Sequence, residues 1–154
     1  MSYITEFEGR IELDKPLDEE LFNFLMKLNQ TRRMKRDPQK LKEMGYPDDY
    51  GIDGEFFVDG GGLFGQEIDD SVMNGDIPPQ TQPSLWCRWR PTTDRSGIEW
   101  DGGEKFYCAD DWMRYLIDSI LAPAGYLANG EIQATGEEVW QLIVTDNEVN
   151  TIYG

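Results

Sequence analysis

The sequence contains four pairs of adjacent carboxylates, a residue type that can take part in catalysis. Two carboxyl groups that flank a substrate, with their pKa values pushed apart, can act as general acid and general base. Neighbours in sequence point to opposite faces of a strand, however, and two acids at a helix start also stabilise the helix N-terminus. The pairs are Asp48-Asp49, Asp69-Asp70, Asp110-Asp111 and Glu137-Glu138. By themselves they do not predict a catalytic site.

Carboxylates beside a glycine run suggest a second chemistry, the binding of Ca²⁺ or Mg²⁺ through oxygen. Asp53, Glu55 and Asp59 precede or adjoin the glycines at 60–62. Their spacing does not match a calcium-binding loop, and Leu63 follows the glycines where a phosphate-binding loop needs Lys and Ser or Thr. We therefore predict no metal and no cofactor, and keep a carboxylate- and metal-dependent enzyme as a third hypothesis.

Tryptophan and arginine alternate in a segment that reads as a β-hairpin over residues 85–100. One side of the first strand would carry Leu85, Cys87 and Trp89, and the other side two arginines and a further tryptophan. An exposed tryptophan beside a guanidinium group can stack on a planar ligand or anchor an interface, while cation–π packing on the sheet is the structural alternative. The candidate ligand-binding residues are Trp86, Arg88, Trp89, Arg90 and Trp100.

Composition excludes several classes of function. The chain has 154 residues, 30 Asp and Glu, 14 Lys and Arg, and no histidine, so the net charge is −16. Without histidine there is no Ser-His-Asp triad and no His-ligated zinc. The acidity argues against direct binding to nucleic acid. Cys87 and Cys108 are expected to be reduced thiols, and the N-terminal sequence has neither a signal peptide nor a membrane span. We expect a cytoplasmic protein.

The charge is unevenly distributed along the chain. Residues 1–42 carry a net charge of +1, and residues 43–154 carry −17. The only basic cluster is the run from Thr31 to Asp37. It is explained either as the cationic C-terminus of a helix, which complements the helix dipole, or as a contact for an anion or nucleic acid.

The elements that must position these residues follow from hydrophobic periodicity and turn residues. Alternation predicts a strand over residues 3–13, and an apolar stripe at helical spacing predicts a helix over 18–34. A second amphipathic helix follows from the stripe between Ala109 and Ile120. Further strands are predicted over 55–58, 85–90, 98–100, 126–134 and 139–145.

The order of these elements is β-α-β-β-β-α-β-β. It predicts an α+β fold in a single domain over residues 1–154, with two helices packed on one face of a mostly antiparallel sheet. Residues 59–84 form a long irregular segment, which is the expected place for a binding loop.

Several short motifs are spread over most of the chain, namely Trp86-Cys-Arg-Trp89, Glu99-Trp-Asp-Gly-Gly-Glu-Lys-Phe-Tyr107, Trp112-Met-Arg-Tyr-Leu-Ile117, Gly136-Glu137 and Asp146-Asn147. Together they resemble a family of small acidic proteins from tailed phages and prophages. The resemblance implies an accessory gene of a phage or mobile element, active in the cytoplasm of the host bacterium. It implies no particular mechanism.

Three hypotheses about function follow. The first is a non-catalytic acidic protein that binds a host protein through its basic, nucleic-acid-binding surface, as DNA mimics of the anti-CRISPR and anti-restriction type do. The second is a small-molecule or nucleotide binder that uses the hairpin residues, and the third is the metal-dependent enzyme. We favour the first. Its candidate contact residues are Asp48, Asp49, Asp69, Asp70, Asp76, Glu131, Glu137, Glu138, Asp146 and Glu148.

Overall fold

The chain forms two compact units. The computed structural model describes residues 5–46, 48–58, 68–103 and 106–153. The first unit, the sheet unit, comprises residues 1–23 and 88–154, and the second comprises residues 24–87. None of the described helices is long and apolar enough to cross a membrane.

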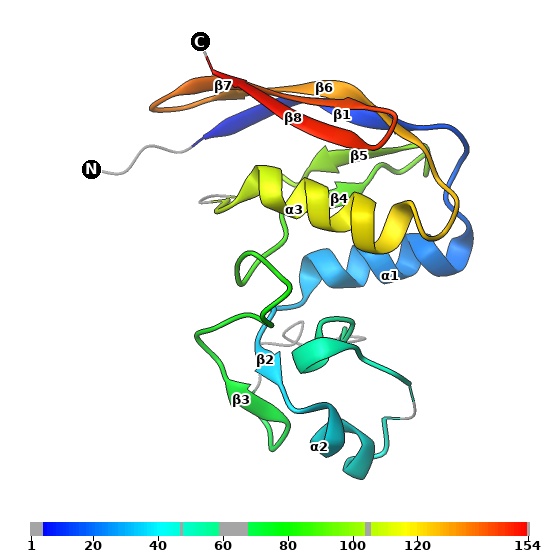
Figure 1. Cartoon of the computed structure of the whole chain (residues 1–154), viewed down its shortest axis with the longest axis vertical. Helices are drawn as coiled ribbons and strands as arrows, with labels where there is room; N and C mark the ends of the chain where they lie inside the picture. The colour runs from blue at the N-terminus through cyan, green and yellow to red at the C-terminus, as the bar shows by residue number, and fades with distance from the viewer. Residues whose placement is uncertain (1–4, 47, 59–67, 104–105, 154) are drawn as a thin grey trace. The chain divides into compact units, whose positions relative to one another are not determined.

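A six-stranded antiparallel sheet forms the sheet unit, and its strand order is β4-β5-β1-β6-β7-β8 (Figure 1). This confirms the predicted α+β class with an antiparallel sheet. The strands are β1 (Glu6–Leu13), β4 (Trp89–Pro91), β5 (Gly97–Trp100), β6 (Ala128–Thr135), β7 (Val139–Thr145) and β8 (Glu148–Tyr153).

One face of this sheet, the inner face, is buried. Helix α3 (Ala109–Leu116) and the π-helical turn η2 (Ile117–Leu121) lie on the same side of the sheet (Figure 1). The stripe predicted for this helix is buried throughout, and it comprises Ala109, Trp112, Met113, Leu116, Ile117 and Ile120. Burial of this stripe contributes to the hydrophobic stabilisation of the unit.

Phe7 is the centre of an aromatic cluster on the inner face. Its ring makes edge contacts with the rings of Trp89, Trp100 and Trp140, at centroid distances of 5.2, 5.5 and 5.9 Å. Such edge-to-face pairs add to the energy of burial. The tryptophans of β4, β5 and β7 are therefore held together by one phenylalanine of β1.

Helix α1 (Glu19–Gln30) begins in the sheet unit and continues into the second unit. Its start is fixed by the Tyr126 hydroxyl, which accepts a hydrogen bond of 3.1 Å from the Asp18 amide, and by Arg95, whose guanidinium lies 4.9 Å from the Phe22 ring centroid. The predicted helix over 18–34 was too long by four residues at its C-terminal end.

The second unit is mostly irregular, and it differs most from the prediction. It contains β2 (Lys35–Arg36), α2 (Pro38–Glu43), the 3₁₀ turn η1 (Ile52–Gly54) and β3 (Val72–Asn74), with β2 and β3 paired. Residues 55–58 do not form the predicted strand, because Glu55 and Phe56 belong to the turn that follows η1 and residues 57–58 have no regular secondary structure. Helix α2 was missed, although Asp37 caps it and Pro38 follows at its first position. Of the predicted irregular segment, residues 68–84 are described and residues 59–67 lie outside the described residues.

Strand β8 was also missed. Asp146 and Asn147 have φ of 46° and 70°, which is the conformation of a two-residue hairpin turn between β7 and β8. The side chain of Asn147 fixes this turn, since its Oδ1 accepts from the Ala128 amide at 2.6 Å and its Nδ2 donates to the Tyr126 carbonyl at 3.0 Å. The sequence signal for β8 was present, because an Asp-Asn turn is followed by valine, threonine, isoleucine and tyrosine.

Candidate binding surface

The face of the sheet opposite α3, the outer face, is exposed to solvent. The strand registers place on it the side chains of Glu6, Glu8, Arg10, Glu12, Arg90, Glu99, Asn129, Glu131, Gln133, Thr135, Val139, Gln141, Ile143, Thr145, Glu148, Asn150 and Ile152. No described helix covers this face (Figure 1). Six of these side chains are carboxylates and two are cationic.

Two glycines bring β1 and β6 together at the centre of the outer face. A Cβ on Gly9 would lie 2.6 Å from the Glu131 carbonyl oxygen, and one on Gly130 would lie 2.7 Å from the Arg10 carbonyl oxygen. Their φ angles of +103° and +153° are also unfavourable for other residues. Only glycine fits at both positions, and this fixes the spacing of Glu8, Arg10 and Glu131.

Arg10 of β1 is paired with Glu131 of β6 in the strand register, but the Arg10 guanidinium forms its hydrogen bonds with other residues. It donates to the carboxylates of Glu12 and Asp94 and, at 2.7 Å, to the hydroxyl of Ser96. The hydrogen bond from Arg10 lowers the pKa of Glu12. The pKa of Asp94 lies far below its usual range, mainly because the Thr92 hydroxyl and the Ser96 amide donate to it.

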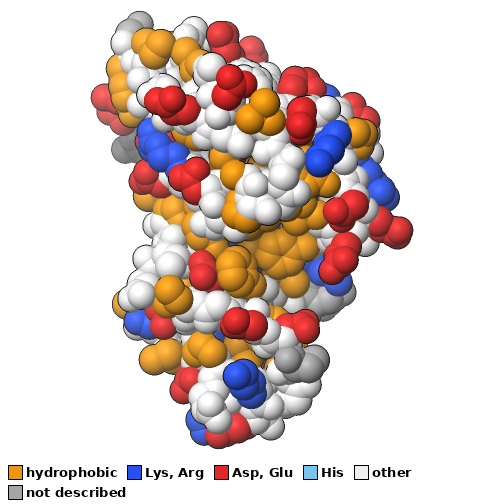
Figure 2. Space-filling model, turned by 45° about the vertical axis from the view of Figure 1, so that its right-hand side comes forward, with side chains coloured by type: hydrophobic (Ala, Val, Ile, Leu, Met, Phe, Trp, Pro, Cys, Tyr) orange, Lys and Arg blue, Asp and Glu red, His pale blue; other side chains and the backbone are white. Residues whose placement is uncertain are grey.

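The remaining outer-face carboxylates have no cationic partner among the described residues. Arg90 pairs with Glu99 at 3.3 Å, so both cations of the outer face are engaged. Among the described residues, no ion pair involves Glu6, Glu8, Glu131 or Glu148. Carboxylates (red) are spread over the sheet unit at the top of Figure 2, with Lys and Arg (blue) between them.

The charge of the chain is also divided differently from the prediction. The sheet unit has 19 acidic and seven basic side chains, a net charge of −12, and the second unit has 11 and seven, a net charge of −4. The sequence had assigned the acidity to residues 43–154. In the fold, the carboxylates of β1 join those of β6 and β8 in one sheet, so the sheet unit is the acidic part.

The ten predicted contact carboxylates are divided equally between the two units. Asp48, Asp49, Asp69, Asp70 and Asp76 belong to the second unit, and Glu131, Glu137, Glu138, Asp146 and Glu148 to the sheet unit. All are exposed except Asp69, which is half-buried in contact with Arg36 and Ser71. Within the sheet unit, Glu131 and Glu148 lie on the outer face, Glu148 at the end of the sheet that also carries Asp146, while Glu137 and Glu138 lie at the opposite end. Sequence reasoning missed Glu6 and Glu8 of β1.

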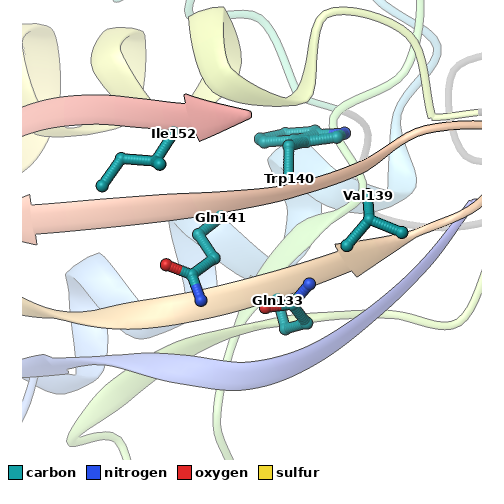
Figure 3. Close-up of a pocket in the computed structure, with 5 residues that line it drawn as sticks. All are labelled: Gln133, Val139, Trp140, Gln141 and Ile152. Atoms are coloured by element: carbon teal, nitrogen blue, oxygen red, sulfur yellow. The ribbon is translucent and has the colours of Figure 1, made fainter. Parts of the chain in front are cut away.

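Three shallow hollows lie along β7 and β8. One is formed by side chains of β6, β7 and β8, namely Gln133, Val139, Trp140, Gln141 and Ile152 (Figure 3). A second lies at the start of β8 and includes Asp118, Asp146, Glu148 and Arg114, which is paired with Asp110 and Asp111. The third lies at the turn between β6 and β7 and includes Glu137, Glu138 and Trp140. The two end hollows are acidic, and the middle hollow is apolar and amide-lined.

The tryptophan and arginine residues of the hairpin serve mainly structural roles. Trp89 is 1 % exposed and donates from Nε1 to the Ala109 carbonyl at 2.8 Å, so it belongs to the core. Trp100 is half-buried and donates to the Gly103 carbonyl at 3.2 Å. Arg88 lies 4.0 Å from the Asp101 carboxylate, and Arg90 pairs with Glu99. Trp86 is half-buried and belongs to the second unit.

The basic cluster at 31–37 stabilises the interior of the second unit. Arg33 is 2 % exposed and donates to the Glu55 carbonyl at 2.7 Å and to Gln82 Oε1 at 3.2 Å. Arg36, also 2 % exposed, donates to the Ser71 hydroxyl at 2.7 Å and pairs with Asp69 at 3.3 Å. Neither explanation fits Arg33 and Arg36, because these arginines follow the end of α1 and their guanidinium groups are buried. The other basic residues of the run, Arg32 and Lys35, are half-buried and pair with Asp76 and Asp53.

Among the described residues, no group of three or more Asp, Glu or Cys could hold a metal ion. Asp53 pairs with Lys35 at 3.7 Å, and the Glu55 carboxylate accepts from the Thr81 hydroxyl at 2.6 Å. Asp59, the third predicted ligand, lies outside the described residues. Cys87 and Cys108 are reduced and form no disulfide, as expected, and burial together with Asp111 and Asp110 raises the pKa of Cys108.

Comparison with known proteins gave no match, since no family model, curated protein or solved structure is detectably similar to this chain.

Proposed function

We propose that this chain is a non-catalytic acidic protein that binds another protein through a basic, nucleic-acid-binding surface and competes there with nucleic acid. One observation carries the proposal. The outer face of the sheet is uncovered and presents Glu6, Glu8, Glu131 and Glu148 without ion pairs among the described residues. An extended sheet face with uncompensated negative charge is complementary to the Lys and Arg patches that bind phosphates.

The spacing of these carboxylates supports the proposal. Glu6 and Glu8 are two residues apart on β1, which separates their Cα atoms by about 6.8 Å. Glu8 and Glu131 are diagonal neighbours across β1 and β6, at roughly 7–8 Å. Each strand of duplex DNA carries one phosphate per roughly 3.4 Å of helix axis, so the two charge densities are of the same order.

The rigidity of the face also supports it. β1 and β6 pair over eight residues, and the glycines at 9 and 130 allow the close approach of the two strands. Carboxylates on such paired strands need little ordering when a partner binds, which lowers the entropic cost of association.

The resemblance to phage proteins gives the proposal a biological setting. An accessory phage protein of this kind would act in the cytoplasm of the host bacterium against a nucleic-acid-handling or defence protein. It would bind that protein and not nucleic acid, since the sheet unit has a net charge of −12.

A competition experiment tests the proposal. The chain is immobilised and used to capture proteins from a nuclease-treated bacterial lysate at low salt, and a captured protein is then purified with its labelled DNA or RNA ligand. We expect the chain to displace the nucleic acid, with an affinity that falls steeply as salt is raised. Displacement that is independent of salt, or binding that leaves the nucleic acid in place, would contradict the proposal.

Charge reversal on the sheet locates the contact. The double variant Glu8→Lys/Glu131→Lys places cations at the centre of the outer face, and we expect displacement to weaken by at least about tenfold. The matched control is Asp48→Lys/Asp49→Lys, which makes the same change in net charge at two exposed positions of the second unit. Equal losses in both variants would show an effect of net charge and not of this face.

A further inference from the structure

Strand β8 is an unprotected edge of the sheet. It runs for six residues from Glu148 to Tyr153, pairs with β7 on one side and pairs with no described strand on the other. Edge strands are usually protected by proline, lysine, bulges or short length. The other edge, β4, has only three residues and ends at Pro91. After Glu148, by contrast, β8 has neither charge nor proline and its register is regular.

The turn at Asp146-Asn147 determines which backbone groups of β8 are free. In a two-residue hairpin, the amide of Glu148 donates across the turn to the carbonyl of Thr145. Alternate residues of an antiparallel strand direct their hydrogen-bonding groups to opposite sides. The N–H and C=O groups of Val149, Thr151 and Tyr153 therefore point away from β7, along the open edge.

Apolar side chains accompany this edge on the sheet surface. Ile152 and Tyr153 are 53 % and 62 % exposed, and Val139 of β7 is 46 % exposed. Ile152 and Val139 line the middle hollow with Gln133 and Gln141 (Figure 3). Side chains of an added strand would find apolar contacts there.

Carboxylates lie at both ends of the edge. At its start are Asp146 and Glu148, with Asp118 and Arg114 in the same hollow. Arg114 is itself paired with Asp110 and Asp111, so this end is acidic. The end of β8 is marked by Tyr153, whose register partner Trp140 shares a hollow with Glu137 and Glu138. A cationic strand would be attracted at both ends, whereas a second copy of this chain would be repelled by the net charge of −12 on each sheet unit.

We propose that β8 accepts an extended segment bearing lysine or arginine, from the bound protein, as a seventh strand of the sheet. This inference rests on the proposed function and adds to it the mode of binding. Main-chain hydrogen bonds to Val149, Thr151 and Tyr153 would give affinity, and the flanking carboxylates would select a basic sequence.

The test uses a synthetic eight-residue peptide in which lysine alternates with valine, followed by NMR of the full chain. We expect the peptide to slow hydrogen exchange of the Val149, Thr151 and Tyr153 amides by at least about tenfold. The comparison peptide has the same sequence with every backbone nitrogen methylated, so it keeps the charge but cannot form a strand. Equal binding of the two peptides, or no binding of either, would overturn strand addition.

Variants of the edge give a second measurement. Thr151→Pro removes an N–H that points away from β7, which an edge strand can tolerate, and Thr151→Ser keeps it. We expect only the proline variant to lose peptide binding, by about tenfold or more. Unchanged peptide binding by Thr151→Pro would overturn the inference. It would also be overturned if, without peptide, the same amides became more protected from hydrogen exchange as the protein concentration was raised, because this would indicate pairing with a second copy of the chain. The displacement of nucleic acid tests the proposed function separately, so strand addition can fail while that function stands.

Discussion

Arg10 faces Glu131 across two paired strands and yet donates its hydrogen bonds to Glu12 and Asp94. The choice follows from position, because Glu12 is two residues along the same strand and face, and Asp94 lies in the adjoining 92–96 turn. Glu131 consequently has no ion pair among the described residues. The proposed contact surface therefore depends on Arg10 pairing with Glu12 and Asp94 and not with Glu131.

Removing that arginine should change the titration of its partner. In Arg10→Gln we expect the pKa of Glu12 to rise, because the hydrogen bond and the charge that lower it are lost. Carboxyl ¹³C NMR across the acid range measures this. The control Arg90→Gln removes one cation from the same face but leaves the Arg10–Glu12 contact in place, and a similar rise there would contradict the assignment. Stability should fall by less than about 1 kcal/mol, since the pair is exposed.

The buried Arg36 should be far more important for stability than an exposed lysine nearby. Arg36→Met leaves Asp69 without its cation and the Ser71 hydroxyl without its donor. We expect the free energy of unfolding to fall by about 2–3 kcal/mol. This is somewhat less than for a fully buried pair, because Asp69 is 36 % exposed. Lys40→Met, which breaks the exposed pair with Glu43, should change stability by less than about 0.5 kcal/mol. Urea unfolding measures both, and losses of similar size would disprove a structural role for the buried arginine.

Acid should weaken the same contact. Partial burial tends to raise the pKa of Asp69, but hydrogen bonds from the Ser71 hydroxyl and amide and the charge of Arg36 lower it on balance. A lowered pKa in the folded state means that ionised Asp69 stabilises the fold above its unfolded pKa of about 3.9, and that this stabilisation is lost as pH falls through the folded value. The difference in the free energy of unfolding between the parent chain and Asp69→Asn should therefore be constant near pH 6 and decrease below about pH 4. Urea unfolding at pH 6, 4 and 3 measures it, and a gap that stays constant would refute this linkage. Asp70→Asn, at the exposed neighbouring position, controls for the loss of one charge.

Patterns local in sequence predicted the sheet unit well. The alternation of Phe7 with Glu6 and Glu8 gave β1 and its two faces, and the stripe from Ala109 to Ile120 gave the buried side of α3. Both depend on residues within one element, where side-chain periodicity directly reflects burial. The return strand β8 was predictable in the same way from the residues after Asn147.

The second unit could not be predicted in this way, because its contacts connect distant residues. Arg33 reaches Gln82, which is 49 positions along the chain, and Arg36 reaches Ser71, which is 35 positions along. Neither arginine carries a local signal for burial, and charged side chains are rarely found inside unless paired. The candidate surface was missed in part for a similar reason, since only the pairing of β1 with β6 brings Glu8 beside Glu131.

The distribution of tryptophan gives each unit its own optical signal. Trp89, Trp100, Trp112 and Trp140 belong to the sheet unit, and Trp86 alone belongs to the second unit. Trp86→Phe would leave fluorescence from the sheet unit only, and the difference from the parent chain would report the second unit. The melting of the two units can therefore be followed separately in a single unlabelled chain.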